Sequence, residues 1–296
     1  KYLPTQHGFD DYFGIPYSND MTPVYNDWER AQNFPKIPLI DDTTILERGP
    51  DQRLLTKKYT EHAVDFIKKH QTKPFFLYLP YTFPHIPLFA SEAFQGTSKR
   101  GLYGDVVQEI DWSVGKILLT IKKLGIKKNT FVFFTSDNGP WLSEKLNGGS
   151  AVLLCGGKGT CSEGGMRERS IAWWPGTIKK GQVVTSLATT MDLFTTSLKM
   201  GSAKIPRDRA IDGKDLAPLL KGQKKHIRNV VYYYRGDELY AIRKGPWKAH
   251  FITVENRYLP NQKVTHHDPP LLFNVETDPS EKYNLAEKHP EILKDL

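Results

Sequence analysis

The feature that most constrains this chain is a short apolar run, Phe131–Phe134, that stops abruptly at a polar turn. Ser136, Asp137, Asn138 and Gly139 follow it almost at once. A fully buried strand has this form, with aromatic and β-branched residues bounded by turn-forming residues. In open α/β sheets, ligands bind outside the carboxyl ends of the strands. The run therefore predicts an α/β fold and puts two oxygen-bearing side chains where chemistry is done.

Asp137 and Asn138 offer a carboxylate and an amide oxygen side by side. Hard divalent cations prefer oxygen ligands, so the pair suits Ca²⁺ or Mg²⁺ better than zinc. Asp-Asn-Gly is also well suited to a tight turn with no ligand at all. From spacing alone, the metal site and the simple turn are both open.

A lysine stands further along the chain between glycines, in the stretch Gly156-Gly157-Lys158-Gly159. Glycines let an anion approach the backbone closely, and a lysine there can neutralise a sulfuryl or phosphoryl oxygen. The spacing of a P-loop is absent. Lys158 is therefore a candidate oxyanion contact, with an ordinary surface lysine as the alternative.

His85 lies between Pro84 and Pro87 in a loop that follows a predicted strand. A rigidly held histidine at such a point can bind an oxyanion or protonate a leaving group. A loop histidine without any function is the alternative. A different pair, Glu163 and Arg167, reads as a buried ion pair that supports the glycine loop.

Hydrophobic periodicity places these residues on elements of a mixed fold. It predicts amphipathic helices at 54–70 and 102–124 and strands at 75–79, 131–134 and 170–174. This strand–helix–strand rhythm is the one that a parallel sheet requires. Residues 1–50 lack the periodicity and read as loops.

The pattern changes near residue 229, where short strand-like runs follow one another without helices between them. Such runs predict a small antiparallel sheet, followed by a helix over 290–296. We therefore expect an α/β domain over residues 1–225 and a smaller antiparallel-sheet subdomain over residues 226–296.

Composition narrows the range of partners. The net charge of +8 favours an anionic substrate, although a solvated basic surface would also account for it. No basic stripe with interleaved aromatics predicts nucleic-acid binding, and no apolar run approaches the length of a membrane span. Cys155 and Cys161 either form a small disulfide across the glycine loop or are both free.

Several stretches together resemble the motifs of type I sulfatases, in particular the group of N-acetylgalactosamine-6-sulfatase and arylsulfatase A. They are Thr135–Pro140, Gly157–Thr160, Glu163–Arg167, Ala172–Gly176 and the carboxyl-terminal Asp278–Glu281 with Asn284-Leu285. The resemblance covers nearly the whole chain. It implies an alkaline-phosphatase-like mixed sheet flanked by helices, with a smaller carboxyl-terminal antiparallel sheet.

The resemblance also implies roles for individual residues. Asp137 and Asn138 would be ligands of Ca²⁺, and His85 and Lys158 would contact the sulfate group as catalytic and substrate-binding residues. The implied activity is hydrolysis of aryl sulfates or of sulfated galactosamine-type glycans, in a lysosomal or secreted protein. A homodimer is a further expectation.

One element of the family pattern is missing. Type I sulfatases attack sulfur with a formylglycine made from the cysteine of a Cys-x-Pro-Ser-Arg motif, and neither Cys155 nor Cys161 lies in such a motif. We therefore expect the nucleophile on an amino-terminal part of the same enzyme, and no activity from these residues alone. The alternatives are a catalytically silent homologue that binds sulfated glycans, and a phosphodiesterase or phosphonate hydrolase of the same superfamily.

Overall fold

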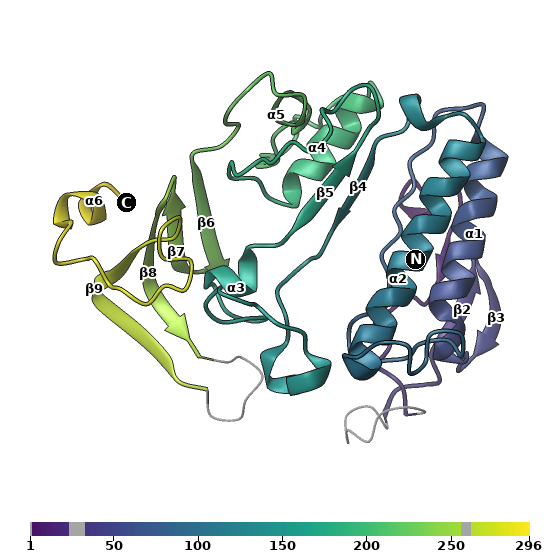
Figure 1. Ribbon diagram of the computed structural model, residues 1–296, viewed down its shortest axis with the longest axis horizontal. Helices are drawn as coiled ribbons and strands as arrows, with labels where there is room; N and C mark the ends of the chain where they lie inside the picture. The colour runs from purple at the N-terminus through teal and green to yellow at the C-terminus, as the bar shows by residue number, and fades with distance from the viewer. Residues whose placement is uncertain (1, 24–32, 256–261) are drawn as a thin grey trace. The chain divides into compact units, whose positions relative to one another are not determined.

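The computed structural model describes residues 2–23, 33–255 and 262–296. They form two compact units, Lys1–Ile126 and Lys127–Leu296, and each is described by itself. The α-helices and most of the strands of both are labelled in Figure 1. The domain boundary expected at residues 225/226 stays a prediction. No helix within the described ranges is long and apolar enough to cross a bilayer.

The first unit combines a small sheet with two long helices. Its elements are η1 (Pro4–Gln6), β1 (Phe13–Gly14), β2 (Pro38–Asp41), β3 (Thr44–Arg48), η3 (Gln52–Leu54), α1 (Leu55–His70) and α2 (Gly101–Lys123). The sheet is antiparallel in the order β1-β2-β3. The expectation of loops over residues 1–50 is wrong at these strands. β3 is exposed along its whole length, so it carries no apolar pattern that could reveal it.

The two helices form where the sequence predicts them and lie side by side (Figure 1). Leu55, Tyr59 and Ala63 recur at helical spacing on the buried face of α1. Leu55 and Tyr59 join Val106 and Ile110 of α2 in one apolar core. The apolar stripes therefore specify this pairing of helices.

The strand predicted at 75–79 is not formed. The segment alternates between half-buried and exposed side chains, with Phe76 and Tyr78 exposed, as an extended chain does. No described strand pairs with it. A strand needs a hydrogen-bonded neighbour, and an apolar run by itself does not supply one.

The second unit carries most of the candidate site. Its elements are η4 (Lys127–Asn129), β4 (Val132–Thr135), η5 (Leu142–Asn147), α3 (Glu163–Met166), β5 (Ser170–Trp173), α4 (Met191–Met200), α5 (Ala217–Leu220), β6 (Val230–Arg235), β7 (Glu238–Lys244), β8 (Trp247–Val254), β9 (Val264–Asn274) and α6 (Pro290–Asp295). β4 and β5 form where predicted and pair antiparallel, so that Thr135 lies opposite Ser170. All described strand pairs are antiparallel, and the parallel pairing expected from the strand–helix–strand rhythm is not among them.

The carboxyl-terminal part is a four-stranded antiparallel sheet in the order β6-β7-β8-β9 (Figure 1). The prediction of a small antiparallel sheet in this region is confirmed. Ala249 and Leu272 of the sheet form a small core with Ala286, against which Ile292 and Leu293 of α6 pack.

Candidate functional site

The turn after β4 presents the predicted metal ligands. Asp137 is exposed and Asn138 is half-buried. The Asn138 side-chain nitrogen donates to the carbonyl of Gly139 at 3.0 Å, and the hydroxyl of Ser136 donates to the Asn138 carbonyl at 3.1 Å. The amide nitrogen of Asn138 is thus engaged, which leaves its oxygen as the atom that can bind a cation.

Gly139 brings this turn against the glycine loop. Its N–H donates to the carbonyl of Gly165 at 3.1 Å. A Cβ at position 139 would lie 1.8 Å from the carbonyl oxygen of Gly164, closer than any real contact. The close approach of two backbones therefore requires glycine here.

Lys158 is joined directly to the same turn. Its N–H donates to the carbonyl of Pro140 at 2.8 Å. A Cβ at Gly157 would lie 2.4 Å from that same oxygen, so this contact too needs a glycine. The structure therefore joins the glycine loop that carries Lys158 to the turn that carries Asp137 and Asn138.

The Lys158 side chain lies over an aromatic ring that the sequence reasoning missed. Its Nζ is 4.7 Å from the centre of the Trp141 ring. A lysine ammonium at this distance is attracted by the negative face of the indole. Trp141 follows the Asp-Asn-Gly-Pro turn directly, and an aromatic residue beside a predicted anion site was the available signal.

A second carboxylate lies near Asp137. Burial, together with the negative charge of Asp137, raises the pKa of Glu168, an effect that the charge of Arg169 opposes. The local negative field around Asp137 would favour a bound cation.

The glycine loop rests on a buried ionic cluster. The Glu163 carboxylate, 1% exposed, accepts from the guanidinium of Arg243 at 2.9 Å and from the ammonium of Lys248 at 3.0 Å. Arg167, the partner expected from sequence, is 3.7 Å away and 44% exposed. The prediction of a buried ion pair is correct for Glu163 but names the weaker of its partners. Its main partners lie 80 residues or more away in the sequence.

His85 belongs to the first unit, in a loop held by Phe83 and Leu88, which are both buried in its core. Its Nδ1 donates to the carbonyl of Ile86 at 2.6 Å, because a carbonyl can only accept. This bond places the Nδ1 proton toward the Ile86 carbonyl and so fixes the orientation of the ring. The two X-Pro bonds that flank His85, Phe83-Pro84 and Ile86-Pro87, are cis.

The residues present fit a calcium ion in kind but supply only part of its shell. Ca²⁺ takes about 6–8 oxygen ligands, and Asp137 and Asn138 provide a carboxylate and an amide oxygen. No cluster of three or more His, Cys, Asp or Glu side chains within the described ranges could hold a metal. Cys155 and Cys161 are both free, and burial raises the pKa of each thiol.

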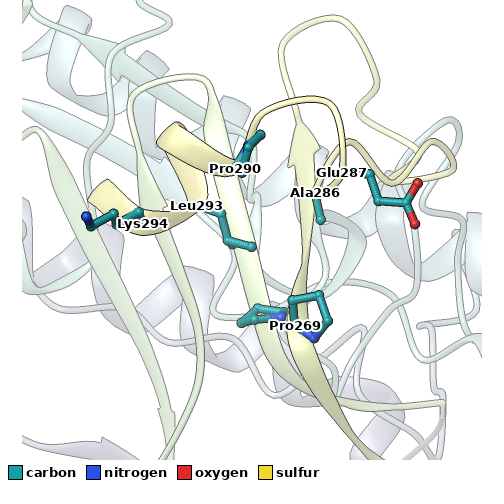
Figure 2. Close-up of a pocket in the computed structure, with 7 residues that line it drawn as sticks. Pro269, Ala286, Glu287, Pro290, Leu293 and Lys294 are labelled. Carbon is teal, nitrogen blue, oxygen red and sulfur yellow. The ribbon is translucent and has the colours of Figure 1, made fainter.

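Two cavities open elsewhere in the second unit. Figure 2 shows one of about 460 Å³ between α6 and β9, and its apolar walls include Pro269, Ala286 and Leu293. The other, of about 510 Å³, is lined by residues that include Arg228 and Trp247. The predicted site residues line neither of these two cavities.

Comparison with known proteins assigns the chain to a family. The Sulfatase family matches residues 2–202, and the C-terminal region of aryl-sulfatase matches residues 226–296. The first match spans well over half of the chain, and the chain therefore belongs to the sulfatase family.

Individual relatives agree. The chain is 44% identical to N-acetylgalactosamine-6-sulfatase of Mus musculus, over 97% of this chain and 59% of the relative. It is 36% identical to human arylsulfatase A, over 100% of this chain and 64% of the relative. The chain thus spans roughly three fifths of the length of these relatives.

Solved structures share the fold. A sulfatase from Pseudoalteromonas sp. matches with a TM-score of 0.89 at 25% identity, covering 99% of this chain and 65% of that one. A Bacteroides thetaiotaomicron protein described with the metabolism of multiple glycosaminoglycans matches with a TM-score of 0.80 at 27% identity, covering 99% of this chain and 72% of that one. The predicted fold class, alkaline-phosphatase-like with a carboxyl-terminal antiparallel sheet, is confirmed.

Proposed function

We propose that the whole protein is a sulfuric ester hydrolase and that this chain carries the Lys158 side of its sulfate site. One observation carries the proposal. In a chain of the sulfatase family, the Lys158 N–H is bonded to the Pro140 carbonyl at 2.8 Å, which fixes the glycine loop against the Asp137–Asn138 turn. The Lys158 ammonium and the two proposed calcium ligands, Asp137 and Asn138, are thereby held on segments bonded to each other before any substrate binds.

Lys158 would bind the sulfate group. Its ammonium lies over Trp141, whose ring covers one side of it. A positive charge held in place stabilises negative charge as it develops on the sulfuryl oxygens, and it needs no reorganisation at the moment of reaction. The half-buried position makes the interaction stronger than it would be for a lysine in open water.

Asp137 and Asn138 would hold Ca²⁺ through the carboxylate and the amide oxygen, with the remaining ligands coming from elsewhere. When bound, a hard divalent cation polarises the oxygens of the sulfate ester. The hydrogen bond from the Asn138 nitrogen to Gly139 supports this role, because it fixes the orientation of the amide.

His85 would bind the sulfate or pass a proton to the departing alcohol. Its Nδ1–H is committed to the Ile86 carbonyl, so Nε2 would be the ring atom that contacts the sulfate, and it could pass a proton to the alcohol only after first taking one up.

The substrate class follows from the relatives. They are named for N-acetylgalactosamine-6-sulfate and aryl sulfate hydrolysis, and we infer a sulfated glycan or aryl sulfate for this protein, in a lysosome or outside the cell. The net charge of +8 is compatible with such a substrate.

The nucleophile is proposed to lie on an amino-terminal part of the same enzyme, as a formylglycine. The chain contains no Cys-x-Pro-Ser-Arg motif. Burial raises the pKa of both Cys155 and Cys161, which disfavours their reactive thiolates.

Turnover of a chromogenic aryl sulfate tests the proposal. The whole protein should hydrolyse it, and Lys158→Ala should lower kcat/KM by about 10²–10³-fold, the loss typical of one stabilising group. Lys221→Ala is the matched control, since Lys221 lies over Trp174 at 5.5 Å, elsewhere in the same unit. The 296 residues alone should show no turnover, and measurable turnover from them would refute the placement of the nucleophile.

A catalytically silent homologue that binds sulfated glycans is the second candidate, favoured by the missing Cys-x-Pro-Ser-Arg motif. The two functions differ in one result. A whole protein that binds the aryl sulfate in a Lys158-dependent way but never cleaves it would be the silent homologue.

A further inference from the structure

The carboxyl-terminal turn contains a residue whose backbone is strained. Glu281 has φ +49°, in the left-handed region that a side chain disfavours. It follows Asp278-Pro279-Ser280, the stretch that resembles the carboxyl-terminal signature of the family. Such strain persists only where surrounding contacts hold the residue in place.

Those contacts reach the glycine loop. One oxygen of the Glu281 carboxylate accepts from the backbone N–H of Glu163 at 2.7 Å. The other accepts from Nε2 of His250 at 2.6 Å, and the ammonium of Lys248 lies 3.5 Å from it. Glu281 therefore ties the first residue of α3 to strand β8.

The preceding residue holds the other end of the loop. The Ser280 hydroxyl donates to the carbonyl of Leu153 at 2.5 Å. Two consecutive residues, Ser280 and Glu281, thus form hydrogen bonds with the chain at positions 153 and 163. Lys158 lies midway between these two points.

The Glu281 end of this attachment lies in a buried cluster of charged side chains in the second unit. The side chains of Glu163, Glu281 and Lys248 are each 3% exposed or less. Lys248 bridges both carboxylates, at 3.0 Å and 3.5 Å, and lies 4.8 Å from the centre of the Tyr233 ring. Because each charge has a partner of opposite sign, the cluster can stay buried without an uncompensated ion.

We propose that Glu281 is a positioning residue, which fixes the loop between Leu153 and Glu163 so that Lys158 stays over Trp141 and faces the sulfate. The proposal rests on the proposed function and adds to it a role for the carboxyl-terminal signature. Glu281 acts through the backbone of Glu163 and needs no contact with substrate. A loop closed at both ends has fewer conformations, so its lysine is held in advance.

A spectroscopic signature of Lys158 in the whole protein tests the proposal. Because its Nζ lies over the indole of Trp141, the protons of its side chain should be shifted upfield by the aromatic ring. The resonances are assigned by their loss in Lys158→Arg. Glu281→Ala should remove more than half of this upfield shift. Glu281→Gln, whose amide oxygen can still accept from the Glu163 N–H, should keep most of it.

Asp192→Ala is the matched control. Asp192 is another fully buried carboxylate of the same unit that accepts from backbone N–H groups and from an arginine. Its loss should reduce stability without changing the Lys158 shift, which separates positioning from general destabilisation.

A folded Glu281→Ala variant with an unchanged Lys158 shift would overturn the proposal. If Glu281→Ala does not fold, Glu281→Asp takes its place, since its shorter side chain cannot reach both Glu163 and His250. It should lose about half of the shift, and an unchanged shift would again overturn the proposal.

Titration of the whole wild-type protein with inorganic sulfate separates this proposal from the proposed function. If the Lys158 resonances do not respond to sulfate, the proposed function fails, while the ring shifts of the variants still report whether Glu281 positions the loop. A sulfate response that is equal in wild type and folded Glu281→Ala would overturn the positioning role alone.

Discussion

Two buried acidic centres in the second unit resemble each other in chemistry but differ in what they hold. Asp192 accepts from Arg228 at 2.5 Å and from the backbone N–H groups of Thr189 and Lys214. Glu163 accepts from Arg243 and Lys248 at 2.9 and 3.0 Å. Both carboxylates are essentially inaccessible to solvent.

The difference lies in their neighbours. Asp192 joins segments near α4 in which no candidate site residue lies. Glu163 ends the loop that presents Lys158 and so couples a buried charge cluster to a half-buried cation. Burial and pairing alone therefore do not mark a functional centre. A functional centre is marked instead by its connection to side chains that can contact a ligand.

The largest effect expected is from removal of either buried carboxylate. Glu163→Ala and Asp192→Ala should each lower the free energy of unfolding by about 3–5 kcal/mol, because each leaves a buried cation unpaired. Urea titration measures this loss. Only Glu163→Ala should also speed amide exchange of Thr160 and Gly164, two of the bonded amides of the loop. Equal exchange in both variants would remove the distinction between the two centres.

The next largest effect on stability is expected where the Asp137–Asn138 turn contacts the glycine loop. Gly139→Ala places a Cβ 1.8 Å from the Gly164 carbonyl, and backbone must move. We expect a loss of about 1–3 kcal/mol in the free energy of unfolding, typical of overpacking. Gly115→Ala in helix α2, where a Cβ meets nothing within 4 Å, is the control. It should gain about 0.5–1 kcal/mol. A neutral Gly139→Ala would mean that the turn and loop are not in contact.

Acid should weaken the Glu163 centre through Glu281. Burial opposes ionisation of Glu281, but the hydrogen bond from His250 and the charge of Lys248 outweigh it and hold the pKa of that carboxyl below its usual range. A depressed pKa contributes stability above the unfolded value, which is 4.5. That contribution is lost as pH falls through the lower folded value.

Glu281→Gln should accordingly flatten the acid side of the stability curve below about pH 4.5, the ordinary range of a glutamate. Urea midpoints measured from pH 3 to pH 7 check this, with the exposed Glu276→Gln as control. An acid limb equally steep in wild type and Glu281→Gln would contradict the assignment.

The smallest effect on stability should come from Lys158 itself. Lys158→Ala removes one partly exposed cation–π contact, worth about 0.5–1 kcal/mol. Lys221→Ala, at its longer distance from Trp174, should cost no more. If Lys158→Ala lowers the free energy of unfolding by several kcal/mol, Lys158 stabilises the fold, as Asp192 does, and is not merely held there to meet a ligand.

Local sequence signals predicted part of the fold. The apolar runs at 75–79 and 131–134 look alike in sequence, yet only the second forms a strand, because β5 provides its partner. The helices α1 and α2 followed from their apolar stripes. The exposed β3 carried no stripe and was missed.

The candidate site likewise contains residues that local sequence marks and contacts that it does not. Turn residues and glycines mark Asp137, Asn138 and Lys158 locally as candidates, and the Lys158–Pro140 bond joins the two segments that carry them. The link between Glu281 and Glu163 spans 118 residues. Contacts so distant in sequence depend on how the sheet β6–β9 packs, which local periodicity does not encode.

Binding of inorganic sulfate to Lys158 is the most direct test of the central claim. This claim is that the Asp137–Asn138 turn and the glycine loop form the sulfate-binding side of a sulfatase. In NMR titrations of the whole protein, the Lys158 side chain and the amides of Gly157–Thr160 should shift saturably with sulfate, and Lys158→Ala should abolish the response. Shifts that do not saturate, or that persist unchanged in Lys158→Ala, would contradict the account.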